Sequence, residues 1–156
     1  MENEKPQTTT PDVIEFEWIK DIKDLKEIQE SMEIRKKVFC EEQNVAAELL
    51  ADDFNFKSHH VIMRKNKVAV GTARLKEDGG QYFIGHVAIL REYRRNGSGQ
   101  LLVKEVLRYA KEIGIKEVNC HSQTYVQRFY EKLGFEAYGE KFYEANIEHI
   151  NMKIIL

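Results

Sequence analysis

The stretch that most constrains the fold is Val87 to Lys104, in which an apolar strand, a polar turn and an amphipathic helix follow one another directly. The turn contains the string Arg94-x-x-Gly97-x-Gly99, whose glycines allow a positive φ and a close approach to another group. Such a turn directs successive backbone N–H groups to one point, where the helix N-terminus adds partial positive charge. With Arg94 and Arg95 beside it, the turn is suited to binding phosphate. An ordinary strand-to-helix turn has the same composition, so the string by itself leaves both interpretations open.

Length and charge limit the classes of protein that fit. A chain of 156 residues is suited to one domain, predicted to span residues 13–156 after a disordered tail over 1–12. Lys and Arg number 24 against 26 Asp and Glu, and this net charge of −2 gives no support to a nucleic-acid partner. Cys40 and Cys120 fit no metal-ligand spacing, and free thiols in a reducing compartment are the simpler interpretation. No apolar run approaches the roughly 18 residues of a membrane span, and the tail lacks the apolar core of a signal peptide. We therefore expect a cytoplasmic protein without a membrane partner.

Hydrophobic periodicity predicts the order of the elements. The strands are predicted over 13–19, 60–63, 68–75, 81–90, 116–120, 135–139 and 147–155. Helices are predicted from Leu25 through Val38, over 99–113 and over 125–133, with a charged helix end or turn over 35–43 and a loop over 46–56. A hairpin signal at Glu77-Asp78-Gly79-Gly80 makes the middle strands antiparallel, whereas a helical crossover makes the fourth and fifth strands parallel. The fold class is therefore α/β (α+β), a mixed and twisted sheet with flanking helices.

A second motif lies further along the chain, in the string Phe129-Tyr130-Glu131-Lys132-Leu133-Gly134-Phe135. Together with the Arg/Gly turn and this order of elements, it makes the chain resemble the GNAT superfamily of N-acetyltransferases over about Ile14 to Leu156. The second motif is also similar to that of glucosamine 6-phosphate N-acetyltransferases. Similarity to the ElaA-like branch rests on the strings Arg35-x-x-Val38-Phe39, Glu42-Gln43 and Gly71-Thr72-Ala73-Arg74.

The resemblance implies acetyl-CoA as the donor and a fourth strand that bulges and parts from the fifth. Backbone N–H groups of the turn would hold the pyrophosphate, and the edge of the fourth strand would bind the pantetheine arm and the acetyl carbonyl. Gln123 stands where relatives often have an Asn that contacts the cofactor, and Tyr130 matches the tyrosine beside the thioester sulfur. The residues implied to bind the cofactor are Val87, Ala88, Ile89, Arg94, Arg95, Asn96, Gly97, Ser98, Gly99, Gln100, Gln123 and Tyr130.

Direct acetyl transfer requires a neutral amine, a polarised carbonyl, a stabilised oxyanion and a stabilised leaving thiolate. We expect backbone N–H groups near Ala88 and Ile89 to face the oxyanion, and Tyr130 to protonate or hydrogen-bond the CoA sulfur. His121 is the candidate base because an imidazole, with a pKa of about 6.5, accepts protons near neutral pH. A histidine that only caps the fifth strand is the alternative. The histidines are scattered along the chain, so no metal site is expected.

The acceptor is predicted only as a small molecule with a primary amine. Glucosamine 6-phosphate is the first candidate, and a polyamine, an amino acid or a protein lysine is the alternative. A sugar phosphate needs a second cationic pocket, although such cations are usually solvated surface charges. A non-catalytic acyl-CoA-binding module and an acyl-homoserine-lactone synthase are further possible functions, and a homodimer through the C-terminal strands is expected. The cations available for a phosphate are Lys36, Lys37, Arg74, Arg128 and Lys132.

Overall fold

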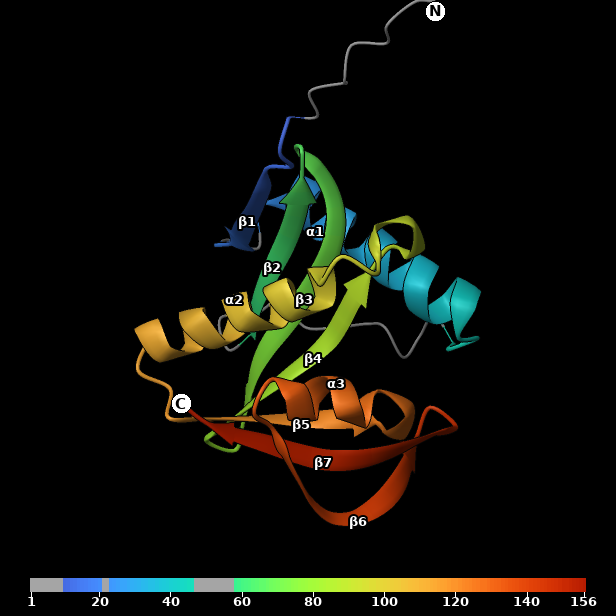
Figure 1. Ribbon diagram of the computed structural model, residues 1–156, viewed down its shortest axis with the longest axis vertical. Coiled ribbons are helices and arrows are strands. Elements are labelled where there is room, and N and C mark those ends of the chain that lie inside the picture. The colour runs from blue at the N-terminus through green and yellow to red at the C-terminus, as the bar shows by residue number, and fades with distance from the viewer. Residues whose placement is uncertain (1–9, 21–22, 47–57) are drawn as a thin grey trace, which may run out of the picture.

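The computed structural model describes residues 10–20, 23–46 and 58–156, so residues 1–9 of the predicted tail and nearly all of the predicted 46–56 loop lie outside the described residues. Seven strands form one sheet in the order β1-β2-β3-β4-β5-β7-β6 (Figure 1). They are β1 (Ile14–Ile19), β2 (Ser58–Lys65), β3 (Val68–Asp78), β4 (Gln81–Ile89), β5 (Glu117–Gln123), β6 (Glu136–Glu144) and β7 (Ile147–Ile155). The α-helices are α1 (Leu25–Arg35), α2 (Ser98–Glu112) and α3 (Gln127–Lys132). The predicted order of elements is confirmed. Within the described ranges, no helix is long and apolar enough to cross a lipid bilayer.

β4 and β5 run parallel, as predicted, but they pair only briefly. Phe83 lies opposite Asn119 and Ile84 opposite Cys120, and these are the residue pairs that join the two strands. Beyond Ile84 the strands separate, as Figure 1 shows between the end of β4 and β5. The side of β4 that would face β5 is therefore left without a strand partner.

A bulge in β4 accompanies this separation. Thr72 of β3 lies opposite Ala88, and Arg74 lies opposite Gly85, so β4 contains one more residue than β3 over this interval. The extra residue falls at His86, whose left-handed φ of 49° is uncommon for a residue with a side chain. The prediction that the fourth strand bulges and parts from the fifth is confirmed.

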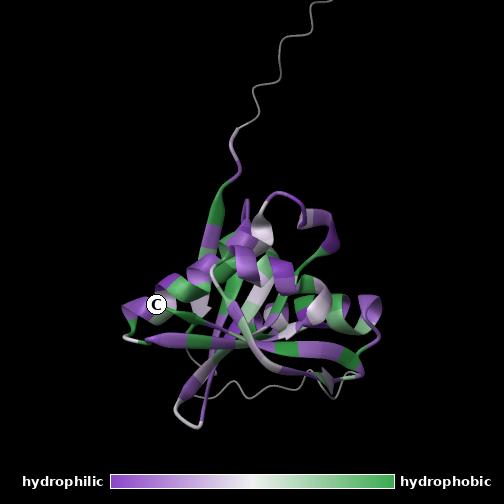
Figure 2. Ribbon diagram, turned by 60° about the horizontal axis from the view of Figure 1, so that its bottom comes forward, coloured by the Kyte–Doolittle hydropathy of each residue, from purple (hydrophilic) through white to green (hydrophobic). Residues whose placement is uncertain are grey.

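α2 covers one face of the sheet with an apolar stripe. Leu102, Val103, Val106 and Ala110 are fully buried and belong to the main hydrophobic cluster, together with residues of β2, β3 and β5. Their spacing places them on one side of a helix, and burial of each larger aliphatic side chain contributes about 1.5–3 kcal/mol. Figure 2 shows hydrophobic and hydrophilic segments alternating along the elements, as expected where each has one buried face.

α1 and the segment that follows it pack against Thr72 of β3 and Ala88 of β4. The hydroxyls of Ser31 and Thr72 lie 2.6 Å apart in a buried hydrogen bond. Ile34 and Val38 form a second cluster with Ala88. After α1 the chain continues as a π-helix over Lys36–Glu42, where the sequence had indicated a charged helix end or turn. The difference arises because Val38, inside this segment, is buried and holds the extra turns against the sheet.

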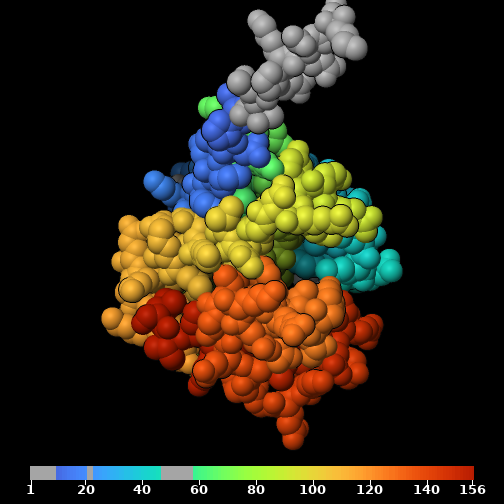
Figure 3. Space-filling view, in the orientation of Figure 1, coloured from blue at the N-terminus to red at the C-terminus, as the bar shows by residue number. Residues whose placement is uncertain are grey.

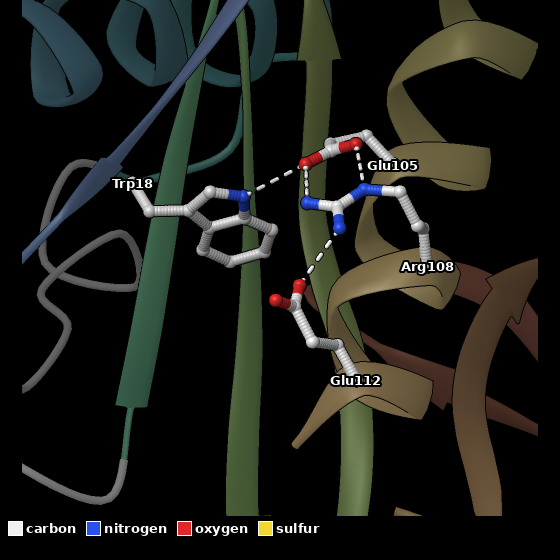
Figure 4. A network of polar contacts seen from close by, with 4 residues as sticks. All are labelled: Trp18, Glu105, Arg108 and Glu112. Carbon is white, nitrogen blue, oxygen red and sulfur yellow. Dashed lines mark hydrogen bonds and ion pairs between the residues drawn. The ribbon is translucent and has the colours of Figure 1, made fainter. Parts of the chain in front are cut away.

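β1 is fastened to α2 by a polar network around Trp18 (Figure 4). The indole Nε1 donates to Glu105 at 3.1 Å, and Arg108 donates to the same carboxylate at 2.6 and 2.7 Å. Arg108 also donates to Glu112 at 2.7 Å. The indole ring stacks on Tyr109 with a centroid distance of 3.8 Å. These contacts join an edge strand to the helix that begins at the Arg/Gly turn.

β6 is longer than predicted, and this difference affects the site. The sequence prediction ended the strand at Gly139, which has a positive φ of 74°. The glycine lies in an irregularity of the β6–β7 ladder, after which pairing resumes at Phe142 opposite His149. The strand then extends to Glu144 and brings that carboxylate to the end of the hairpin.

Candidate active site

A cavity of about 910 Å³ opens where β4 and β5 part. Its walls come from the end of β4, the turn before α2, the end of β5, the start of α3, the π-helix and the β6–β7 turn. Figure 3 shows the surface hollowed where the yellow segment around the start of α2 meets the orange segment around α3. Every residue expected to bind the cofactor lines this cavity except Asn96, and the candidate base His121 lines it as well.

The turn before α2 forms one wall of the cavity. Arg95 and Gly97 both have positive φ, at 86° and 73°. Gly97 is the N-cap of α2, and the N–H of Leu101 donates to its carbonyl at 3.0 Å. The helical N–H groups before Leu101 have no carbonyl one turn earlier to bind, so an anion can accept from them.

Gly99 is required for a different reason from Gly97. It lies within the first turn of α2, and a Cβ at this position would stand 3.2 and 3.3 Å from ring atoms of Phe129. The glycine therefore permits close contact between the start of α2 and α3. This contact joins the two sequence motifs in one wall of the cavity.

Arg94 uses its side chain to hold the turn in place. Its Nε donates to the carbonyl of Ile89 at 2.9 Å, and its terminal nitrogen donates to both carboxylate oxygens of Glu42 at 2.8 and 3.0 Å. Its backbone N–H donates to the carbonyl of Arg91 at 3.3 Å. The sequence had offered Arg94 as a phosphate donor, whereas these bonds direct its guanidinium toward the protein. Arg95, which follows it, lines the cavity.

Val87, Ala88 and Ile89 form the cavity wall on the open side of β4. Ala88 and Ile89 are buried and pair with β3 on their other side. Because β5 has already separated at this level, the strand edge offers backbone groups to a ligand instead of to a neighbouring strand.

Tyr130 lines the cavity and is buried beside two rings, with centroid distances of 5.0 Å to Phe129 and 5.4 Å to Phe135. Burial, followed by its contact with Cys120, raises the pKa of the Tyr130 phenol well above its usual value. Burial likewise raises the pKa of the Cys120 thiol to about 12. Both groups therefore keep their protons at neutral pH, and the phenol acts as a hydrogen-bond donor.

His121 lines the cavity and has a defined environment. Its ring meets Phe83 and Phe142 edge to face, with both centroid distances at 5.4 Å. Its Nδ1 lies 3.7 Å from Glu144 Oε1, and the other carboxylate oxygen, Oε2, lies 3.7 Å from Nε2 of His149. The contact with His121 is the main cause that lowers the pKa of Glu144, so this group is ionised at neutral pH.

The cations expected to bind a phosphate are only partly gathered at the cavity. Arg74 lines it, whereas Lys36, Lys37, Arg128 and Lys132 are not among its lining residues. The sequence reasoning did not include Lys76, which lines the cavity two residues after Arg74 on the same face of β3. A cationic pocket would therefore be built from β3 and not from α3.

The remaining histidines have separate surroundings. His59 bonds the hydroxyl of Tyr109 at 2.8 Å, and His60 bonds Arg35 at 2.9 Å, so both belong to the packing of β2. His86 lines the cavity at the bulge. No cluster of three or more residues suited to a metal ion is found in the part of the chain that the structure describes.

Sequence reasoning missed Glu144 and Gln43. Gln43 follows the π-helix and accepts a bond of 2.9 Å from the side-chain amide of Gln123, so it holds another predicted cofactor residue. Glu144 was missed because β6 was ended too early. The pair Ala145-Asn146, which has positive φ at both positions, is a hairpin turn whose Asn was the available signal.

Comparison with known proteins agrees with this arrangement. The chain matches the acetyltransferase (GNAT) domain family over residues 20–156. A provisionally named acetyltransferase of Bacillus subtilis (strain 168) is 34% identical over 137 residues, which cover 86% of this chain and 93% of the relative.

Two solved structures are similar over nearly their whole length. An acyl-CoA N-acyltransferase from Pseudomonas aeruginosa superposes with a TM-score of 0.81 at 27% identity, covering 91% of this chain and 99% of that one. Escherichia coli ElaA superposes with a TM-score of 0.78 at 26% identity, covering 90% and 99%. The family match, the bulged β4, the parted strands and the glycine turn lead to one conclusion: this chain belongs to the GNAT acetyltransferase family.

Proposed function

We propose that this N-acetyltransferase transfers an acetyl group from acetyl-CoA directly to the primary amine of a small molecule. The observation that carries the proposal is the cavity itself. It brings the N–H groups at the start of α2, the open edge of β4 and the hydroxyl-bearing Tyr130 to one space. These are the groups that a nucleotide diphosphate, an amide-containing arm and a thioester sulfur need in sequence along one ligand.

The donor would lie along the cavity from the turn to Tyr130. Its pyrophosphate would accept from the N–H groups of residues 95–100, with Arg95, Ser98 and Gln100 adding polar side chains. Its pantetheine arm would follow Val87, Ala88 and Ile89, and Gln123 would contact it from β5. Asn96 is not among the residues that line the cavity, and its contact with the cofactor stays a prediction from the sequence.

The reaction proposed is a single acyl transfer. The lone pair of the neutral amine attacks the thioester carbonyl carbon, so a C–N bond forms and the C–S bond then breaks. His121 accepts the proton that leaves the nitrogen and passes it to solvent. Backbone N–H groups at the β4 bulge would stabilise the oxyanion, a contribution of about 2.7–4 kcal/mol for each donor. Tyr130 donates a hydrogen bond to the departing sulfur, which takes its proton from solvent because the phenol holds its own strongly.

Glucosamine 6-phosphate is the acceptor that we propose to test first. Arg74 and Lys76 supply positive charge on β3, which is suited to an anionic group on the acceptor. A polyamine, an amino acid or a protein lysine is the alternative.

The test is a release assay for free thiol with acetyl-CoA and a panel of amines that includes glucosamine 6-phosphate. We expect thiol release that depends on an added amine, with the acetylated amine identified by mass spectrometry. If every amine gives the rate of the blank while coenzyme A still raises the unfolding temperature, the protein binds acyl-CoA without catalysis. The absence of both amine-dependent turnover and coenzyme A binding would refute the assignment of the cavity.

Three further properties remain predictions from the sequence. We infer one acetyltransferase domain over residues 13–156, a cytoplasmic location and a homodimer formed through the C-terminal strands.

A further inference from the structure

We propose that Glu144 is a positioning residue that, with His149, makes His121 the proton acceptor of the reaction. This inference rests on the proposed function, because it concerns the proton that leaves the acceptor amine. Glu144 stands at the end of β6, His121 on β5 and His149 on β7, and all three line the cavity. The hairpin therefore brings a carboxylate between two imidazoles from neighbouring strands.

The contacts of His149 define which of its nitrogens carries a proton. Its Nδ1 lies 2.6 Å from the carbonyl oxygen of Ile147. A carbonyl oxygen only accepts, so Nδ1 must be the donor. The neutral ring would then turn the lone pair of Nε2 toward Glu144 Oε2, where two acceptors face each other at 3.7 Å. His149 is therefore oriented by two contacts, with Nδ1 turned to Ile147 and Nε2 turned to Glu144.

His121 turns its other ring nitrogen, Nδ1, toward Glu144. Its Nδ1 faces Glu144 Oε1 at 3.7 Å, so the carboxylate favours the tautomer with the proton on Nδ1. The lone pair is then on Nε2, where it can take a proton from a bound amine. Phe83 and Phe142 hold the ring from two sides, and 43% of the side chain is exposed. The ring is thus fixed in orientation and still reachable.

Glu144 links the two rings electrostatically. The charged and titratable groups that face it are His121 from β5, His149 from β7 and Arg74 from β3. Lys76 and Asp78 of β3 line the same cavity. A proton that arrives on His121 is stabilised by the carboxylate of Glu144 and would be disfavoured by a second proton on His149. The two neighbours therefore act on His121 in opposite directions.

This opposition supplies the test. Glu144→Gln should lower kcat about ten- to hundredfold, because the amide can donate to Nδ1 and so favours the wrong tautomer. It should also move the midpoint of the pH–rate profile to lower pH, since the protonated ring loses its anion. His149→Asn should move the midpoint to higher pH, since the side chain at this position can then no longer carry a positive charge that opposes a proton on His121. KM for acetyl-CoA should stay unchanged in both variants.

The matched control is Glu140→Gln, on the same strand but exposed and outside the cavity. It should leave kcat and the pH–rate profile unchanged. Shifts of the two test variants in the same direction, or no shift in either, would overturn the proposal. If Glu144→Gln fails to fold, the upward shift in His149→Asn still decides the question.

A second readout separates this inference from the proposed function. The Cε1–H resonance of His121 is titrated by NMR in the wild-type chain and in the three variants, without any substrate. Opposite shifts of its midpoint in Glu144→Gln and His149→Asn are expected even if no amine is acetylated. Opposite shifts without any acetylation would support the proposed role of Glu144 and His149 and would contradict the proposed transferase activity. Identical titrations in all four proteins would refute the cluster whatever the assay shows.

Discussion

Gly97 and Gly79 have similar backbones, with φ of 73° and 58°, and neither has an atom within 4 Å of the place of a Cβ. Gly97 lies in the turn before α2, whereas Gly79 lies in the β3–β4 hairpin. Gly97→Asp should weaken coenzyme A binding at least tenfold, about 1.4 kcal/mol, because its carboxylate would repel the pyrophosphate. Gly79→Asp carries the same backbone strain and should bind normally. Isothermal titration calorimetry measures both, and equal affinities would show that the turn does not bind a diphosphate.

Tyr130 also permits a conservative test. Tyr130→Phe removes the hydroxyl and keeps the ring beside Phe129 and Phe135. We expect kcat to fall about ten- to hundredfold with little change in KM for acetyl-CoA, because the bond to sulfur strengthens as the thiolate leaves. Tyr143→Phe is the control, since that side chain is 74% exposed. Full activity of Tyr130→Phe in steady-state kinetics would remove the phenol from the mechanism.

At the scale of elements, the contact between β1 and α2 depends on Glu105. A hydrogen bond from Arg108 is the main cause that lowers the pKa of Glu105 below 4.5, its usual value. A carboxyl with a lowered pKa in the folded state stabilises the fold above its unfolded pKa and loses this contribution as the pH falls. Glu105→Gln should therefore lower the free energy of unfolding by about 1 kcal/mol at pH 7 and by less near pH 3.

Urea unfolding at the two pH values measures this difference. Glu112→Gln is the control, because Glu112 shares Arg108 but has a 64% exposed side chain, and its effect should stay within about 0.5 kcal/mol. A Glu105→Gln penalty that does not depend on pH would show that packing around Trp18, and not charge, fixes β1 to α2.

Most elements could be predicted from the sequence because their signals are local. The hairpin at Gly79-Gly80, the end of α2 near Gly114 and the apolar stripe of α2 all depend on neighbours within a few residues. The π-helix could not be predicted, since its extra turns depend on Val38 packing against Ala88, a contact between distant parts of the chain. β6 was ended early because a glycine with positive φ usually marks a turn, whereas Gly139 sits in an irregularity inside a strand.

The residues of the candidate site also divide into those with a local sequence signal and those without one. The glycine turn and Tyr130 belong to contiguous motifs, so the resemblance drawn from the sequence could place both in one candidate site. The pairing of Arg94 with Glu42 joins the turn to the π-helix and has no local signal. Glu144 reaches His121 only because β7 lies between β5 and β6 in the sheet. Its role therefore depends on strand order, which periodicity does not reveal.

At the scale of the whole molecule, the sheet ends in β1 on one side and β6 on the other. β6 is largely exposed and carries Tyr138 and Tyr143, which are 39% and 74% exposed. An edge strand that carries exposed aromatic side chains favours association. We expect sedimentation equilibrium at micromolar concentration to give twice the mass of the chain, and Tyr143→Glu to reduce it toward that of one chain.

Val13→Glu introduces the same charge beside β1, where Val13 is 54% exposed. It should leave the dimer intact. Dissociation by Val13→Glu alone would move the interface to the opposite edge, and a monomer in the unaltered protein would contradict the predicted dimer.

The brief pairing of β4 and β5 makes the sheet discontinuous along one line, since only Phe83 and Ile84 of β4 meet β5. A ligand with its own amides can lie along this seam as a substitute strand and restore the interrupted ladder. Hydrogen–deuterium exchange would then report occupancy directly, with residues 87–89 exchanging faster in the free protein than in its complex with coenzyme A. Bound coenzyme A would then complete the sheet and make the molecule more rigid, and its release would make the molecule more flexible again.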